Sequence, residues 1–395
     1  MQEKGQIYAV TERQREWVDR IGEIADRHAD GARIADETNG FNHALVEELK
    51  AAGYYKLAVP ESLGGLGFSV YEYLLCQERL ARVDAPSALA VGWHHTTLYD
   101  LGQSRRWERP IYERLCAEVV SRGALINSAE TEKATGSPSR GGRPQTTARL
   151  REDGGFALTG RKTFTSLSPA LDYFIVSAVD SESGNVAEFL VPKGTPGIRI
   201  EPTWDMVGMR GTASHDLVLE NAELPPEARV FVRPPGFHKA LPNPYLLNIP
   251  AVYLGIAGAA RREAVAFAAS YQPNSLDKPI VHLPHIREKI GRMELELSAA
   301  REFMYGVAAR WDRTKEEAPD RLPDMRADLS AAKMFAVQSA ISVVDTAMRI
   351  CGAHALAGSS PMQRYYRDVR FGLSNPPMDD GTLNVLADRA ISELG

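Results

Sequence analysis

Apolar residues recur at helical spacing through the first third of the chain. Trp17, Ile21 and Ile24 fall on one face of a helix, and Tyr73 and Leu80 lie in a later helical stretch. Between these stretches is VPESLGGLGFS, whose glycines allow backbone conformations that other residues resist. Residues 1–124 are therefore predicted to form an N-terminal helical domain.

The middle third changes to short β-rich segments separated by Gly, Pro, Asp and Asn. These segments are TTARLRED, FALTGRKTFTS, DYFIVSAVD, AEFLVPK, IRIEPTW and HDLVLENAEL. Strands at this spacing, with turn residues between them, are typical of a small antiparallel sandwich or barrel. Residues 125–235 are predicted to form a middle β domain.

A proline-rich connector, RPPGFHKALPNP, precedes a second helical region. Long helical patterns cover about 247–271, 284–313 and 325–352, and a shorter one follows Gly381. Each pattern has apolar residues on one face of the helix and charged residues on the opposite face, as the helices of an antiparallel bundle require. Residues 236–395 are predicted to form a C-terminal four-helix bundle, so the expected fold class is a multi-domain α+β protein.

Composition narrows the possible partners. A net charge of -5 and a pI near 6.0 give no basic face for a nucleic acid. No apolar leader segment or membrane-length apolar run is present in the sequence, so we expect no membrane span. The cysteines Cys76, Cys116 and Cys351 are widely spaced among apolar residues, which favours reduced core thiols over disulfides or a metal site. A cytoplasmic protein is predicted.

Seven patches carry a family resemblance, in the family's order and over almost the whole chain. They are VPESLGGLG with CQERLARVD, ETEKATGSP, LTGRKTFTS, WDMVGMRGTAS, LENAELPPEARV, VVDTAMRICGA and RYYRDVR. Together they resemble the acyl-CoA dehydrogenase superfamily. The resemblance implies helical, β and bundle domains, with a flavin, usually FAD, between the β domain and the bundle. It also implies a homotetramer or homodimer.

The same resemblance assigns residues to the flavin. Thr131 is expected at the pyrimidine edge, and Ser137 near the substrate entrance. Phe164 should lie against the ring, Ser166 should meet N5, and Thr165 between them belongs to the same segment. Without the resemblance, these residues would be read as an ordinary polar loop and a strand with one core phenylalanine.

Two further assignments concern the rest of the cofactor. Arg210 could neutralise a phosphate or tether a loop with its planar fork. Gly352 begins CGAHALAG, which stands where the family has a glycine-rich loop. The family's Arg-x-x-Phe-Gly stretch is replaced by YQPNSLDKPIVHLPH, where Lys278 or His282 could supply a substitute charge. Because both changes fall on the AMP side of FAD, FMN is possible as well.

The default reaction that the resemblance implies is α,β-dehydrogenation of an acyl-CoA thioester, with hydride transfer to flavin N5. Aligning DDGT on the family's Tyr-Glu-Gly-Thr puts Asp380 in place of the catalytic glutamate. The spacing from Asp368 is longer than in the family, and LSNPP fills the excess. Asp379 and Asp380 could instead cap a helix, which would keep their pKa values low.

Two alternatives remain open. Reduced-flavin, O2-dependent monooxygenases of the same superfamily often have Leu-His-Asp-Pro where this chain has Leu373-Ser374-Asn375-Pro376, and a histidine on the N-terminal domain. Ser374 and His95, or its neighbour His94, are the matching candidates, although a histidine on an apolar helix is more often a satisfied core residue. A non-catalytic scaffold is the third hypothesis. The acyl chain and the electron acceptor are not identified by the sequence.

Overall fold

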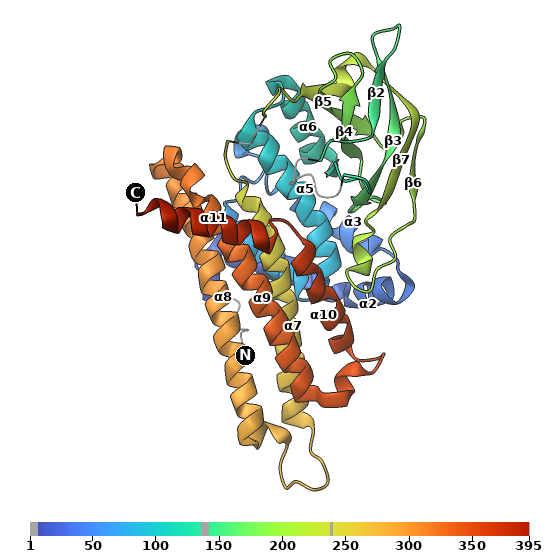
Figure 1. The fold of residues 1–395 in the computed structure, drawn as a ribbon. Helices are drawn as coiled ribbons and strands as arrows, with labels where there is room; N and C mark the ends of the chain where they lie inside the picture. Colours follow the sequence, from blue (N-terminus) through green and yellow to red (C-terminus); the bar gives the residue numbers. More distant parts are fainter. Residues whose placement is uncertain (1–6, 136–141, 238–239, 395) are drawn as a thin grey trace.

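The computed structural model describes residues 7–135, 142–237 and 240–394. Helices come first, a β-sheet follows, and long helices end the chain (Figure 1). In Figure 1 the sheet lies at one end of the molecule, and the long C-terminal helices extend away from it. The predicted fold class, with the order α, β, α, is confirmed.

The N-terminal helices begin where the sequence supplies caps. Their bounds are α1 Glu12–Arg27, α2 Ala29–Thr38, α3 His43–Ala51, α4 Val70–Ala81, α5 Ala85–Ser104 and α6 Arg109–Arg122. Thr11 and Gln14 form a capping box at the start of α1, and Ser69 and Glu72 form another at the start of α4. Each box satisfies backbone N–H groups that the first turn of a helix leaves unpaired.

The middle sheet is mixed, which corrects the expectation of a purely antiparallel domain. Its strands are β1 Ile126–Ala129, β2 Thr147–Leu150, β3 Phe156–Thr165, β4 Tyr173–Asp180, β5 Val186–Pro192, β6 Ile198–Glu201, β7 His215–Leu224 and β8 Arg229–Val232. They follow the order β6-β7-β3-β2-β4-β5-β8, with β1 paired to β4. Strand β4 runs parallel to both β1 and β2. Whether two strands run parallel depends on how the chain connects them across the sheet. The composition of each segment does not determine that connection.

The C-terminal helices are α7 Asn248–Ser270, α8 Pro284–Glu317, α9 Arg326–Cys351, α10 Pro361–Val369 and α11 Asp379–Ser392. α9 packs against both α7 and α8, while the shorter α10 and α11 lie on it (Figure 1). The RYYRDVR patch forms most of α10, a helix that periodicity alone did not predict. α11 starts two residues before Gly381, earlier than the sequence pattern indicated.

Within the described part of the chain, one helical stretch, Pro319–Leu356, is long and apolar enough to cross a membrane by length and composition. It contains α9, and half of its most apolar window is buried inside the protein. Since α9 packs on α7 and α8, its apolar residues serve the core of the helical domain. This stretch is a core helix of the bundle.

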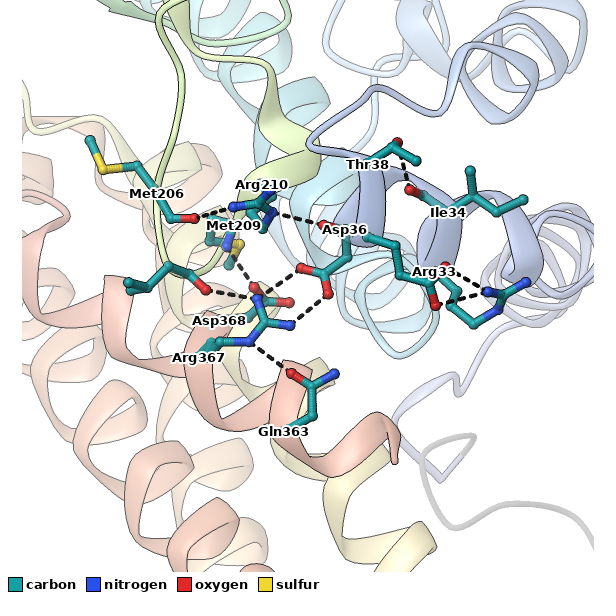
Figure 2. Close-up of polar contacts among 12 residues, drawn as sticks. Arg33, Ile34, Asp36, Thr38, Met206, Met209, Arg210, Gln363, Arg367 and Asp368 are labelled. Atoms are coloured by element: carbon teal, nitrogen blue, oxygen red, sulfur yellow. Dashed lines mark hydrogen bonds and ion pairs between the residues drawn. The ribbon is translucent and has the colours of Figure 1, made fainter. Parts of the chain in front are cut away.

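One polar cluster joins all three parts of the molecule (Figure 2). The guanidinium of Arg367 on α10 donates from Nη1 and Nη2 to the two carboxylate oxygens of Asp36 on α2, at 2.9 and 2.6 Å. Its Nη1 also donates to the carbonyl of Val207 at 2.7 Å. Next to it, the backbone N–H of Met209 donates to Asp368 Oδ1 at 2.5 Å. We call Asp36, Arg367, Asp368 and Met209 the domain clamp.

Burial gives the domain clamp its electrostatic character. Asp368 is almost completely buried, and burial raises the pKa of its carboxyl to about 6, although the Met209 N–H favours the ionised form. Gly208 has no room for a side chain, since a Cβ there would lie 2.5 Å from the Arg367 carbonyl oxygen. The loop that carries Met209 therefore lies directly on α10.

A histidine links the N-terminal helices to the sheet. The Ile126 N–H donates to His94 Nδ1 at 3.1 Å, so His94 Nε2 carries the proton that it donates to the Tyr55 carbonyl at 2.9 Å. Burial lowers the pKa of His94 to about 4, which keeps the ring neutral. His94 is thus a satisfied core residue between α5 and β1.

Replacement of Arg367 by lysine tests the domain clamp. Lysine keeps the charge but cannot bond both oxygens of Asp36 and the Val207 carbonyl in one plane. We expect Arg367→Lys to lower the free energy of unfolding by about 1–3 kcal/mol in urea titrations. Arg33→Lys, on an exposed pair with Glu37, is the matched control and should change it by less than about 0.5 kcal/mol. Equal effects of the two variants would contradict the clamp.

The pH dependence of stability tests the His94 contact. An unfolded histidine binds a proton below its ordinary pKa of 6.5, whereas folded His94 does so only near 4. The stability that neutral His94 supplies is therefore present above pH 6.5 and is lost as pH falls towards 4, by up to roughly 3 kcal/mol. His94→Gln should flatten urea-unfolding free energies across this window, and exposed His43→Gln should not. An unchanged pH slope in His94→Gln would show the assignment to be wrong.

Candidate active site

Three aromatic rings from three segments pack edge to face in a row, which we call the aromatic wall: Phe164, Trp204 and Phe371. The ring centroids of Phe164 and Trp204 lie 5.7 Å apart, and those of Trp204 and Phe371 lie 6.1 Å apart. Trp204 is fixed by its indole N–H, which donates to the Met209 carbonyl at 3.0 Å. The wall thus joins strand β3, the loop before β7, and the segment after α10.

The Phe164 side chain turns out of strand β3 because the backbone of this residue has a left-handed conformation. Its φ is 57°, in the left-handed region, and the pairing of β3 with β7 shifts register between Lys162 and Thr165. Such irregularities re-aim side chains and occur next to functional sites. Phe164 is 52% exposed, which is unusual for a large apolar residue beside a sheet. The ring is available to a planar ligand.

Buried hydroxyl groups gather around the two residues that follow Phe164 in the chain. Ser166 Oγ and Ser214 Oγ lie 2.8 Å apart, and Thr212 Oγ1 lies 2.8 Å from Ser214 Oγ. Thr165 Oγ1 is buried and has no hydrogen-bond partner among the residues that the structure describes. A buried hydroxyl without a partner costs free energy unless a ligand supplies one. These polar groups, beside an exposed aromatic ring, fit the edge of a flavin.

A buried ion pair positions the segment of Thr131 against strand β3. Lys162 Nζ lies 2.5 Å from Glu132 Oε1, and both side chains are inaccessible to solvent or nearly so. Burial disfavours the ionised Glu132, but hydrogen bonds from Lys162 and Thr146 outweigh it and hold the pKa of Glu132 below its usual value. The Thr163 N–H donates to the Thr131 carbonyl at 2.9 Å. Thr131 is therefore adjacent to the segment of Phe164 and Ser166.

Glu132 and Lys162 were not predicted to be structural residues. Both lie in patches that carry the family resemblance, ETEKATGSP and GRKTFTS. The opposite charges of Glu132 and Lys162, in two segments that were both expected at the flavin, could have indicated an ion pair. The spacing of residues along the chain could not show that this pair is buried.

The remaining cofactor candidates lie elsewhere. Ser137 is outside the described residues. Gly352 ends α9, and Figure 1 shows the α9–α10 connection at the end of the helical domain that is remote from the sheet. Arg210 donates from Nε to the Asp36 carbonyl at 2.7 Å and from Nη1 to the Met206 carbonyl at 3.0 Å (Figure 2). Its contacts are those of the tethering alternative, and a role towards phosphate stays a prediction.

His95 faces the interior of the N-terminal domain. Its ring lies 5.1 and 5.2 Å from those of Tyr54 and Tyr73, and neither ring nitrogen has a hydrogen-bond partner among the described residues. Burial lowers the pKa of His95 well below its usual value, so the ring is neutral. The neighbouring His94, in contrast, reaches β1 one residue from Asn127, whose Nδ2 donates to the Ser166 carbonyl at 3.1 Å.

The two aspartates of DDGT occupy the first turn of α11. Met378 is the N-cap residue, so the expectation of an aspartate at the N-cap is wrong, while the first-turn position agrees with the helix dipole. Asp379 accepts from Gln338 at 3.1 Å and lies 3.6 Å from Lys333 Nζ. Asp380 is exposed, and its Oδ1 accepts the Gly381 N–H at 2.9 Å. Its role as a base stays a prediction.

The segment that precedes these aspartates is neutral and anchored. Ser374 is exposed at the end of the short helix η11 Arg370–Ser374. Next to it, Asn375 Oδ1 accepts a hydrogen bond from Tyr253 on α7 at 2.5 Å. Tyr253 was not identified from the sequence, where it is one of many apolar residues of a long helical pattern. No sequence signal couples these two residues, which are 122 positions apart.

A separate hollow of about 620 Å³ lies on the outside of the bundle, between α8 and α9. Its lining includes Arg292, Gln338, Arg349 and Leu373, and it contains no residue of the aromatic wall. The wall, with its unpaired buried hydroxyl, is the better candidate for chemistry.

Comparison with known proteins identifies the family. Acyl-CoA dehydrogenase family descriptions match in three parts: the N-terminal domain over residues 11–104, the middle domain over 127–222 and the C-terminal domain over 247–374. A Bacillus subtilis protein named "Putative acyl-CoA dehydrogenase YdbM" is 47% identical over 97% of this chain and 99% of the relative.

More distant similarities are to a nitrososynthase and to a butyryl-CoA dehydrogenase. L-evernosamine nitrososynthase of a Micromonospora species is 28% identical over 90% of this chain and 85% of that protein. The structure of butyryl-CoA dehydrogenase from Megasphaera elsdenii superposes with a TM-score of 0.85 at 23% identity, covering 97% of this chain and 99% of that one, which shows a common fold. The family implies a flavin and an oxidoreductase activity. The chain belongs to the acyl-CoA dehydrogenase family.

Proposed function

We propose that the aromatic wall and the hydroxyls beside it bind the isoalloxazine ring of a flavin. Support comes from the exposed Phe164 ring, the unpaired Thr165 hydroxyl and the Ser166–Ser214 pair. When bound, a flavin can accept a hydride at N5 or, once reduced, pass electrons to O2. The residues of this chain position its ring and donate or accept hydrogen bonds along its edge. FAD is the expected form, with FMN as the alternative.

We further propose that the reaction is a reduced-flavin, O2-dependent monooxygenation. The observation that carries this proposal is the neutral Tyr253–Asn375 pair in LSNPP, the extra segment that separates Asp380 from Asp368. An α-proton is removed by a carboxylate with a raised pKa in a water-poor pocket. Asp380 is exposed and bonded within its own helix turn, which suits capping better than proton abstraction. Neutral hydrogen-bonding groups instead suit a site that orients a substrate without deprotonating it.

Dehydrogenation of an acyl-CoA thioester is the second candidate. It is favoured by the name of the 47% identical Bacillus subtilis relative. In this candidate Asp380 is the base, whereas Ser374 and His95 are the residues that the resemblance assigns to the monooxygenase. The segment before Asp380 would then have to bring its carboxylate over the flavin.

The oligomeric state, the location and the domain boundaries are also proposals. A homotetramer or homodimer is supported by large apolar side chains exposed on α8, α9 and α11, namely Leu295, Phe303, Phe335, Leu383 and Ile391. A cytoplasmic location and domain boundaries after residues 124 and 235 stay predictions from the sequence.

Two reactions of the purified protein distinguish the candidates. We expect a yellow protein whose released flavin is identified by mass. Mixing the chemically reduced holoprotein with ¹⁸O2 and acetophenone should give a product that has gained one ¹⁸O atom. Butyryl-CoA should not bleach the oxidised flavin without air, and Asp380→Asn should leave the oxygenation unchanged.

The opposite pattern would overturn monooxygenation in favour of dehydrogenation: anaerobic bleaching by butyryl-CoA that is lost in Asp380→Asn but kept in Asp388→Asn, an exposed aspartate of the same helix. A colourless protein that takes up no flavin on reconstitution would contradict both candidates and support the scaffold hypothesis.

A further inference from the structure

The carboxamide of Asn375 is held in one orientation. Its Oδ1 accepts from the Tyr253 hydroxyl at 2.5 Å, so the Nδ2 group points away from Tyr253. No described residue accepts a hydrogen bond from Nδ2, and Asn375 is half-buried. Its two N–H donors are thus oriented by the protein and left for another acceptor.

Tyr253 is the donor in this pair. Its side chain is fully buried, and burial raises the pKa of Tyr253 well above its ordinary value, with the Asp368 charge acting in the same direction. The hydroxyl therefore stays protonated and keeps the proton that it donates to Asn375 Oδ1.

Close packing fixes the segment that carries Asn375. A Cβ on Gly372 would lie 2.6 Å from Val337 Cγ1 and 3.2 Å from Tyr253 Cδ2, so only glycine allows the backbone to lie this close to α9 and α7. Asn375 is four residues beyond Phe371 of the aromatic wall, a span of at most about 14 Å of extended chain. The free amide donors therefore lie in the segment that continues directly from the aromatic wall.

We propose that Asn375 Nδ2 donates a hydrogen bond to a carbonyl oxygen of the substrate, and that Tyr253 positions Asn375 for it. The ligand class is a small carbonyl compound whose apolar body lies against the aromatic wall. This inference rests on the proposed flavin site but not on the reaction that occurs there. Asn375 is a specificity residue, and Tyr253, which acts through it, is a positioning residue.

A matched pair of probes isolates the carbonyl contact. Acetophenone and α-methylstyrene have nearly the same shape, but only the ketone has an oxygen that accepts a hydrogen bond. Titration of the oxidised holoprotein, followed by the absorbance of the bound flavin, should give an affinity for acetophenone about fivefold to tenfold higher than for α-methylstyrene. Binding is measured without turnover, so the result does not depend on O2 chemistry.

Three variants separate positioning from folding. Asn375→Asp keeps an acceptor for the Tyr253 hydroxyl but removes both N–H donors, so the preference for the ketone should fall to about onefold. Tyr253→Phe frees the amide and should lower the preference in the native background but have no further effect in Asn375→Asp. Tyr55→Phe, which removes another buried hydroxyl, bonded to the Val46 carbonyl, is the control and should keep the preference.

Three outcomes would overturn the inference. They are equal affinity of the native holoprotein for both probes, binding of neither probe, or a ketone preference that survives in Asn375→Asp. A native protein that binds no flavin, and is therefore colourless, would instead refute the proposed flavin site. Failure of the carbonyl contact and failure of the flavin site are thus distinguishable.

Discussion

The bidentate pair between Arg367 and Asp36 is the contact on which the arrangement of the site depends. It joins α10 to α2, while the same guanidinium and the neighbouring Asp368 bond the backbone at Val207 and Met209. Met209 in turn accepts the indole N–H of Trp204, and Phe371 follows α10 within a few residues. The aromatic wall is therefore assembled by polar contacts between domains, because its three rings come from segments that share no local structure.

A second polar contact has the same role on the other side of the site. The Glu132–Lys162 pair is buried, and such a pair adds little to stability relative to apolar packing. Its breakage is costly, however, because one buried charge would remain without a partner. The pair therefore favours the one arrangement in which the Thr131 segment lies against strand β3. The Thr165 hydroxyl, which has no hydrogen-bond partner among the described residues, lies in the segment held in this way.

Much of the fold could be predicted from the sequence because it depends on short-range patterns. The apolar spacing of Trp17, Ile21 and Ile24 identifies a helix wherever it packs, and turn residues delimit strands in the middle third. The grouping of Phe164, Thr165 and Ser166 came from one patch. The parallel pairing of β1 with β4, the bond of His94 to Ile126 and the bond between Tyr253 and Asn375 could not be predicted, since each depends on residues brought together only by the tertiary structure.

The central claim is that this site is built from an aromatic wall and neutral hydrogen-bonding groups, without a catalytic carboxylate over the flavin. A crystal structure of the flavin-loaded protein tests it most directly. The account predicts the isoalloxazine ring against Phe164, with its edge within hydrogen-bonding distance of the Thr165 or Ser166 hydroxyl and the Asp380 carboxylate still in the first turn of α11. A ring bound elsewhere, or the Asp380 carboxylate positioned over the flavin N5, would contradict it.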